Sequence, residues 1–316
     1  MKPPLTRRAF CHSVACGVAV TAISNGFAQA PKNPPQGLTL AIGNYGMQSY
    51  KTEEAIRLIA GLKFDALELT VMPEWDSSPE KLKGERRGTV HRFLADTGLT
   101  LTSLMENLPP SANDAEHQKS LERLKLAAGL GHDLAPDSPP LIQTVLGGGD
   151  WSEKKELYRD RLGDWRRIAE STKTIIAIKP HRSGAMSNPE QATWLLEQLG
   201  SSPWLGMIYD YSHYAMRDLS VTETVKTAFP TTVQIVAKDV AKNGEQFEFA
   251  LPGEANTFDH AEILTAFYTA GFRRNVCCEV SSQVFRRPGY DAAAAAKVCY
   301  DFMSRAFEKA GIPRRK

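Results

Sequence analysis

Eight short apolar runs alternate with amphipathic stretches along almost the whole of this 316-residue chain. A short β-prone run predicts a strand, whereas apolar residues that recur every three or four positions predict a helix. Strands are expected at residues 38–43, 66–70, 100–106, 141–147, 174–179, 205–210, 233–239 and 275–279. A helical pattern separates each strand from the next, as parallel strands require of their crossovers.

The helical patterns include residues 52–60, 116–129, 153–172, 189–199, 221–228 and 259–270. In the first of them, Thr52 is expected to cap the helix and Gly61 to end it. Strict alternation allows either a doubly wound sheet or a closed barrel. Ionisable residues follow many of the strands, and only a barrel gathers all eight strand ends around one mouth. The pattern therefore favours a single (β/α)8 TIM barrel.

The N-terminus has the features of an export signal. Arg7 and Arg8 precede an uncharged run from Ser13 to Ile23, which ends at Ala28-Gln29-Ala30. The adjacent arginines resemble a twin-arginine signal, and cleavage after Ala30 would place the protein in the periplasm or another extracytoplasmic location. The alternative is a membrane anchor, but an apolar run of about a dozen residues is short of the ~20 that span a bilayer.

These features predict four segments: a signal peptide over residues 1–30, a linker over 31–37, the barrel over 38–312 and a basic tail over 313–316. Without the signal, 35 basic residues face 36 acidic ones, so the cationic field of a nucleic-acid-binding protein is lacking. Cys277, Cys278 and Cys299 remain after cleavage, and three cysteines do not make a disulfide framework. The adjacent Cys277 and Cys278 are expected as small buried side chains.

Charged residues at strand ends are the candidate site. Lys179 and His181 end the fifth predicted strand and share its parity, so both can face the same space. Asp210 and His213 end the sixth, and they can ligate a metal or bind a sugar hydroxyl. Glu279 ends the last strand inside an apolar run, where an unpaired charge would be costly.

Other strand ends and loops supply weaker candidates. Glu68 and Lys238 end the second and seventh predicted strands, and Glu254 lies in a Pro-Gly-Glu turn after a predicted hairpin. These three, with His181 and His213, are expected to bind substrate. Trp75 and Trp151 can either stack on a sugar or pack in the core. The glycines at 147–149 lack a phosphate-loop pattern and indicate a tight turn.

The order and spacing of several motifs resemble the xylose isomerase-like TIM-barrel superfamily, the sugar phosphate isomerase/epimerase and AP endonuclease 2-type family. They are Gly61-Leu62-Lys63-Phe64-Asp65-Ala66-Leu67-Glu68-Leu69, Lys179-Pro180-His181, Asp210-Tyr211-Ser212-His213, Lys238-Asp239, and Gly253-Glu254 followed by Gly271-Phe272 and Glu279. The resemblance covers residues 38–310 and implies an enzyme that moves a proton next to the carbonyl of a carbohydrate.

The resemblance also implies one divalent cation, such as Mn²⁺, Mg²⁺ or Zn²⁺, held by Glu, Asp, His and Glu at four strand ends. Asp210 and Glu279 match two of these positions, whereas Lys179 stands at the first Glu and Val236 at the His. Either a cation binds through His181, Asp210 and Glu279, or Lys179 takes its place. In the second case Lys179, with Glu279 and Asp210, polarises the sugar carbonyl or shuttles a proton.

The sequence thus predicts an exported sugar isomerase or epimerase with a small carbohydrate substrate, with Lys179, Asp210 and Glu279 as catalytic residues. Two alternatives remain open: a sugar-binding barrel without catalysis, and a lyase or hydratase that acts on an oxidised glycoside. A DNA-repair endonuclease is disfavoured by the near-neutral charge, the export signal and the altered ligand positions. No nucleic-acid partner and no membrane span after cleavage are expected.

Overall fold

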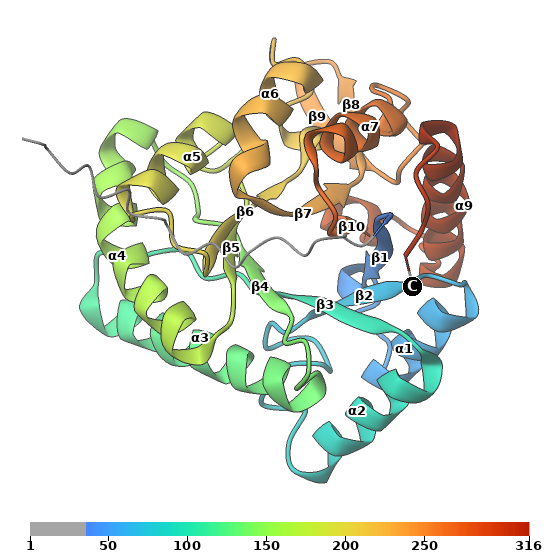
Figure 1. Ribbon diagram of the computed structural model, residues 1–316, viewed down its shortest axis with the longest axis horizontal. Coiled ribbons are helices and arrows are strands. Elements are labelled where there is room, and N and C mark those ends of the chain that lie inside the picture. The colour runs from blue at the N-terminus through green and yellow to red at the C-terminus, as the bar shows by residue number, and fades with distance from the viewer. Residues whose placement is uncertain (1–35, 316) are drawn as a thin grey trace, which may run out of the picture. The chain divides into compact units, whose positions relative to one another are not determined.

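The computed structural model describes residues 36–315, and their central element is a closed barrel of eight parallel strands (Figure 1). Around the barrel the strands follow the order β1-β10-β7-β6-β5-β4-β3-β2. Their bounds are β1 Thr39–Gly43, β2 Ala66–Thr70, β3 Thr100–Met105, β4 Leu141–Thr144, β5 Ile176–Ile178, β6 Leu205–Tyr209, β7 Thr232–Ala237 and β10 Asn275–Cys278. The predicted (β/α)8 barrel is confirmed. The predicted signal peptide and most of the predicted linker lie outside the described residues.

Helices surround the strands on the outside of the barrel (Figure 1). The α-helices are α1 Thr52–Gly61, α2 Glu85–Thr97, α3 Asp114–Leu134, α4 Trp151–Thr172, α5 Pro189–Gln198, α6 Val221–Ala228, α7 His260–Ala270, α8 Ser282–Phe285 and α9 Ala292–Ala310. Three short 3₁₀ helices join them: η1 Asn44–Gly46, η2 Tyr211–His213 and η3 Phe229–Thr231. Among the described residues, no helix has the length and apolar character needed to cross a membrane.

Side-chain parity divides the core into two layers. Inside the barrel, Leu141, Ala177, Ile208, Val233 and Val236 form a compact apolar cluster. The alternate strand residues point outward and form the larger cluster with the apolar faces of the helices. Burial on both faces explains why the strands read as continuous apolar runs. Cys277, Cys278 and Cys299 are free and buried, as expected of small core side chains.

The structure corrects several element bounds. Helix α1 begins at Thr52, whose hydroxyl donates to Asp76 instead of capping the helix. The seventh barrel strand ends at Ala237, two residues earlier than predicted, because Asp239 begins a separate antiparallel hairpin. This hairpin pairs β8 Asp239–Asn243 with β9 Gln246–Ala250.

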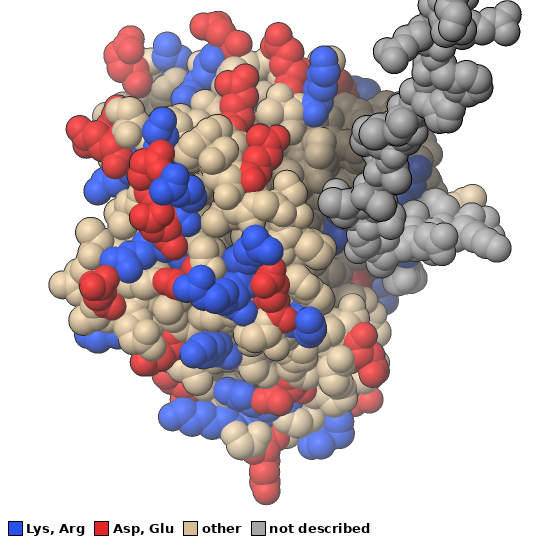
Figure 2. Space-filling view, turned by 60° about the vertical axis from the view of Figure 1, so that its left-hand side comes forward, with Lys and Arg blue, Asp and Glu red and all other residues tan. Residues whose placement is uncertain are grey.

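The last described residues pack against the barrel. Arg314 forms a bridge with Leu38, and its guanidinium donates two hydrogen bonds to the buried Asp65 at 2.8 and 2.9 Å. Residues 313–315, which the sequence assigned to a basic tail, therefore belong to the folded unit. Figure 2 shows basic and acidic side chains interspersed over the face in view. This mixture agrees with the near-neutral charge of the sequence without its signal.

Candidate active site

Four neighbouring strands each place a charged side chain directly after their last residue. Lys179 follows β5, Asp210 follows β6, Lys238 follows β7 and Glu279 follows β10. Because these strands are consecutive around the barrel, the four side chains enter the mouth from adjacent positions. Each is nearly inaccessible to solvent, with at most 6% of its surface exposed. Buried charges of this kind require partners of opposite sign.

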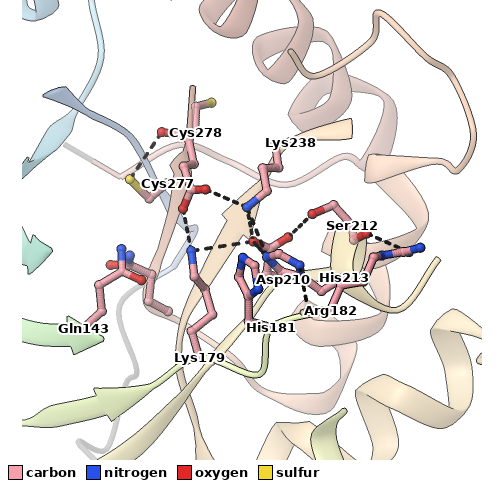
Figure 3. Close-up of polar contacts among 12 residues, drawn as sticks. Gln143, Lys179, His181, Arg182, Asp210, Ser212, His213, Lys238, Cys277 and Cys278 are labelled. Carbon is pink, nitrogen blue, oxygen red and sulfur yellow. Dashed lines mark hydrogen bonds and ion pairs between the residues drawn. The ribbon is translucent and has the colours of Figure 1, made fainter. Parts of the chain in front are cut away.

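The partners are one another. The Lys238 ammonium donates to Asp210 Oδ2 and to Glu279 Oε1, each at 2.6 Å. Lys179 Nζ lies 2.5 Å from the other Glu279 oxygen and 3.9 Å from Asp210 Oδ2. In Figure 3 the two lysines reach the cluster from opposite sides. The three residues predicted to be catalytic do converge, and Lys238 links two of them.

The pairing fixes the ionisation of the cluster. Burial alone would raise the pKa of Glu279, but Lys179 and Lys238 outweigh it and lower that pKa to about 2. The pKa of Asp210 is likewise lowered well below its usual range, chiefly by Lys238 against the effect of burial. Glu279 and Asp210 raise the pKa of Lys179 although burial opposes them. At neutral pH Lys179 is therefore an ammonium group, which fits carbonyl polarisation better than proton shuttling.

Two histidines lie beside the ion cluster, with ring centroids 4.1 Å apart. His213 Nδ1 accepts the backbone N–H of Arg182, so its proton is on Nε2, which lies 3.4 Å from Asp210 Oδ2. His181 Nδ1 accepts the N–H of Ser183 at 3.3 Å, which also puts the His181 proton on Nε2. Burial, with the nearby cations, lowers the pKa of His181 to about 2 and that of His213 to about 4. Both rings are therefore neutral.

The β8–β9 hairpin covers one side of the cluster. The Lys238 ammonium lies 4.8 Å from the centre of the Phe249 ring, and the His213 ring packs edge-on to the same ring at 4.9 Å. The Gln283 side chain on α8 accepts the Phe249 backbone N–H at 2.7 Å. An aromatic ring thus shields Lys238 from water on this side, which strengthens its ion pairs.

A cavity of about 150 Å³ opens at the mouth, next to the ion cluster. Its lining residues are Tyr45, Met72, Met105, Glu106, Asn107, Gln143, Thr144, Val145, Lys179, His181 and Glu279. Tyr45 stacks on Trp75 at 5.2 Å between ring centroids and meets Phe285 edge-on at 5.1 Å. Trp75 therefore supports an aromatic wall without lining the cavity itself. Trp151 packs edge-on against Trp194.

Glu106 is a second carboxylate on this cavity, and it comes from the end of β3. Arg123 donates to its Oε1 at 2.5 Å, and the backbone N–H of Asn107 donates to its Oε2 at 3.3 Å. Burial outweighs Arg123 and raises the pKa of Glu106 to about 7. Glu106 is thus suited to exchange a proton near neutral pH, as Glu279 is not.

The eight predicted site residues separate into three groups. Lys179, His181 and Glu279 line the cavity, whereas Asp210, His213 and Lys238 lie buried beside it within the ion cluster. His213 and Lys238, which the sequence predicts to bind substrate, are sealed from solvent in this arrangement, and their side chains bond to the cluster.

Glu68 and Glu254 lie outside the cavity lining. Glu68 is buried inside the barrel, where it accepts hydrogen bonds from Ser103 at 2.7 Å and Gln234 at 3.1 Å. It also accepts one from Gln143, which lines the cavity. The Glu254 carboxylate accepts the Leu251 N–H in a turn after β9 and is partly exposed beside Arg287. Asp239 holds this turn, since its Oδ2 accepts three backbone N–H groups within residues 253–256.

The sequence interpretation missed Tyr45, Glu106 and Gln143 as cavity residues. Glu106 carried a signal, because it is an acidic residue at the end of a predicted strand. Tyr45 follows β1 on the 3₁₀ helix η1, and no sequence pattern distinguishes it from a core aromatic residue. Gln143 lies within β4, and its direction into the barrel depends on the register of that strand.

A family model described as "Xylose isomerase-like TIM barrel" matches residues 56–302. The chain belongs to the xylose isomerase-like TIM barrel family. No curated protein matches the chain in sequence.

Solved structures show the same fold. The IolI protein with a bound zinc atom is 17% identical, with a TM-score of 0.70, over 86% of this chain and 99% of its own. An L-ribulose 3-epimerase is 18% identical, with a TM-score of 0.68, over 87% of this chain and 96% of its own. A fusion of a xylose isomerase-like barrel with 4-hydroxyphenylpyruvate dioxygenase is 18% identical, with a TM-score of 0.69, over 87% of this chain; the match spans 43% of the fusion protein.

The zinc in one solved relative raises the question of whether this xylose isomerase-like barrel can hold a metal in the same way. The carboxylates at its mouth are Asp210, Glu279 and Glu106. Lys179 or Lys238 binds an oxygen of each of the first two, and Arg123 binds an oxygen of Glu106. Among residues 36–315, no three His, Cys, Asp or Glu side chains are grouped as metal ligands. The residues present, in this arrangement, do not fit a divalent cation.

Proposed function

We propose that this barrel is an exported enzyme of the isomerase or epimerase kind, which moves a proton next to the carbonyl of a small carbohydrate. The observation that supports this proposal most is that two functional groups of different kinds line one cavity. An ammonium group, Lys179, and a carboxylate with a pKa near neutrality, Glu106, both line it. These are the two groups that proton abstraction next to a carbonyl needs.

Lys179 supplies the positive charge. Removing a proton beside a carbonyl leaves negative charge on the carbonyl oxygen, and a fixed cation in a water-poor site stabilises that charge. The Glu279 carboxylate holds the Lys179 ammonium in place at 2.5 Å. Because both Glu279 oxygens accept from ammonium groups, Glu279 is a weak base and acts here by positioning Lys179.

Glu106 is the proposed base. Its pKa of about 7 lets it accept a proton at neutral pH and return it to the same carbon or a neighbouring one. Return to the opposite face of the same carbon, after the intermediate has turned over in the cavity, gives an epimer. Return to the former carbonyl carbon, with transfer of the neighbouring hydroxyl proton to the former carbonyl oxygen, gives an isomer. Loss of a leaving group from the same intermediate would instead give a lyase, which the first step alone does not distinguish.

The cavity restricts the size of the substrate. Its volume of about 150 Å³ lies below the ~300–1,000 Å³ typical of sites for drug-sized ligands. This favours one sugar unit over an oligosaccharide. The Tyr45 ring offers an apolar face and the His181 Nε2–H offers a donor for a hydroxyl. The L-ribulose 3-epimerase among the solved relatives agrees with a substrate of this class.

Deuterium exchange tests the shared first step, whichever product the reaction gives. Ketoses, aldoses and 3-keto-glycosides are incubated with the protein in D₂O, and the carbon next to the carbonyl is followed by NMR. We expect deuterium to enter at least one of these sugars with wild-type protein and not with Lys179→Met. Stabilisation of the wild type by a sugar, with no exchange across the panel, would contradict catalysis and indicate a sugar-binding barrel.

Export is the second part of the proposal, and its support is the Arg7-Arg8 pair followed by an apolar run. The test is fractionation of the full-length protein, expressed in a bacterium with a twin-arginine pathway. We expect periplasmic protein that lacks residues 1–30, and cytoplasmic, uncleaved protein when Arg7 and Arg8 are both replaced by Lys. Uncleaved wild-type protein in the cytoplasm would refute export.

A further inference from the structure

The position of Lys238 is the starting point. Its nitrogen lies 2.6 Å from one oxygen of Asp210 and 2.6 Å from one oxygen of Glu279. It is therefore at the point that the two carboxylates share. Only 2% of the Lys238 surface is exposed, so the ammonium is a fixed part of this site.

A metal ion bound by both carboxylates would need the same space. Divalent ions lie about 2.0–2.6 Å from carboxylate oxygens. An ion bridging these two oxygens would thus be placed almost on the Lys238 nitrogen, against its positive charge. The ammonium and the ion exclude each other by contact and by charge.

The charge of the cluster is that of a site with a divalent ion. Lys179 and Lys238 bring two positive charges to the two negative charges of Asp210 and Glu279. Each of the two carboxylates faces Lys238, and Lys179 adds the charge that faces the cavity. The cluster is neutral without any further cation.

Two of the positions that the family resemblance assigns to metal ligands hold other side chains. Val236 on β7, which the family resemblance places at the metal His, is buried and packs with Ile208 and Ala177 in the barrel interior. Lys179 stands where the resemblance places a ligand Glu. Of the four ligand positions, two therefore hold side chains that cannot coordinate a divalent ion.

We propose that Lys238 occupies the divalent-cation position of this barrel and, with Lys179, replaces the ion's charge. Lys238 is a positioning residue that binds the two carboxylates. Lys179 provides the positive charge that faces the cavity. This inference concerns what binds Asp210 and Glu279, and it holds whether or not the reaction is a sugar isomerisation.

The proposal is tested by opening the position. Wild-type protein, the double variant Lys238→Ala/Val236→His and the control Lys242→Ala/Val236→His are treated with a chelator, dialysed and titrated with Mn²⁺. Metal content is measured by mass spectrometry and stability by thermal unfolding. Lys242 lies exposed on β8 of the same hairpin, so the control removes a lysine without vacating the position.

We expect wild type and control to retain no stoichiometric Mn²⁺ and to show no change in Tm on its addition. The Lys238→Ala/Val236→His protein should bind about one equivalent, because two carboxylates and an imidazole then face a vacated space, and its Tm should rise with Mn²⁺. A folded double variant that takes up no metal would overturn the proposal. A wild-type protein that binds one Mn²⁺ per chain, or gains stability from it, would also overturn the proposal. The wild-type titration therefore tests the proposal even if the double variant does not fold. None of these measurements depends on catalytic turnover, so a negative result would refute this inference without refuting the proposed reaction.

Discussion

The two ends of the barrel each contain a cavity, and they differ in what lines it. The mouth cavity has a volume of about 150 Å³ and is lined by Lys179, His181, Glu106 and Glu279 among others. The cavity at the amino ends of the strands is larger, at about 350 Å³. Its lining is mostly hydroxyl, proline and aliphatic side chains, including Thr39, Thr100, Thr102, Ser138, Pro139, Pro140 and Leu141.

The larger cavity is therefore not the one that carries the reactive side chains. Among the residues of 36–315 that line the larger cavity, Arg274 and Arg315 are the ionisable ones, and no carboxylate, lysine or histidine of this range accompanies them. At the mouth, by contrast, each charged group is buried and held by another. A parallel barrel produces this asymmetry because its carboxyl ends carry the functional residues and its amino ends mainly carry stability. Four measurements test that contrast, and they follow in order of decreasing effect.

Replacing Lys179 with Met is expected to lower the rate of deuterium exchange about 10³-fold, since loss of one preorganised group at a developing oxyanion costs about 10²–10³. The variant's circular dichroism shows whether it is folded, and Lys238 still binds Glu279. Exchange at the wild-type rate by a folded Lys179→Met protein would remove the functional distinction between the two ends.

Acid is expected to destabilise the folded barrel through groups buried at the mouth. His213 has a folded pKa of about 4 against 6.5 when unfolded, so the unfolded chain gains a proton first. His213 should therefore contribute a fall in the free energy of unfolding, on the order of 3 kcal/mol, as pH drops from 6.5 to 4. His181, with a pKa of about 2, contributes in the same direction, and Glu106, with a pKa of about 7, contributes in the opposite direction. Glu279, with its pKa lowered to about 2, adds a further loss below about pH 4.5. Urea unfolding at several pH values measures this fall in the free energy of unfolding. A smaller fall in His213→Gln than in the wild type would assign the difference to His213 at the mouth, whereas equal falls would contradict the prediction.

The rate of exchange should depend on the ionisation of Glu106. With a pKa of about 7, its carboxylate becomes available as a base above that pH, so kcat/KM should rise with pH through neutrality. Glu106→Gln should lower the rate at pH 8 by about 10²-fold and flatten the profile. An unchanged pH profile in the variant would transfer the role of base to another residue.

The smallest effect is expected at the opposite end. Within the described part of the chain, the Arg315 side chain donates its hydrogen bonds to the Thr39 hydroxyl, at 3.3–3.4 Å. Arg315→Met should change the free energy of unfolding by less than about 0.5 kcal/mol, and exchange activity by less than about twofold. A strong loss of exchange in this variant would show that the larger cavity takes part in function.

Periodicity predicted the alternation of strands and helices, because each strand is buried on both faces and each crossover has a recognisable apolar stripe. The ionisable residues at the strand ends then distinguished a closed barrel from a doubly wound sheet. The strand ends also pointed to Lys179, Asp210 and Glu279, which meet as expected. What could not be predicted was which of these charged side chains bind one another. The role of Lys238 depends on its bonds to two other strand ends, and a single residue's position on its own strand does not contain that information.

Side-chain direction and loop geometry explain why two other predicted site residues do not line the cavity. Glu68 was expected at a strand end, but it is the third of the five residues of β2, where Ser103, Gln143 and Gln234 hold it inside the barrel. Glu254 lies in a turn whose position is set by Asp239 through long-range hydrogen bonds. In both cases tertiary contacts, which have no local sequence signature, decide whether a carboxylate reaches the cavity.

The role of Lys179 at the mouth can be tested by a crystal structure with bound substrate, using the sugar that exchanges fastest in D₂O. We expect the sugar in the mouth cavity, with its carbonyl oxygen within about 2.7–3.1 Å of Lys179 Nζ and Lys238 still bound to Asp210 and Glu279. A sugar seated at the amino ends of the strands, or one whose carbonyl points away from Lys179, would contradict this role.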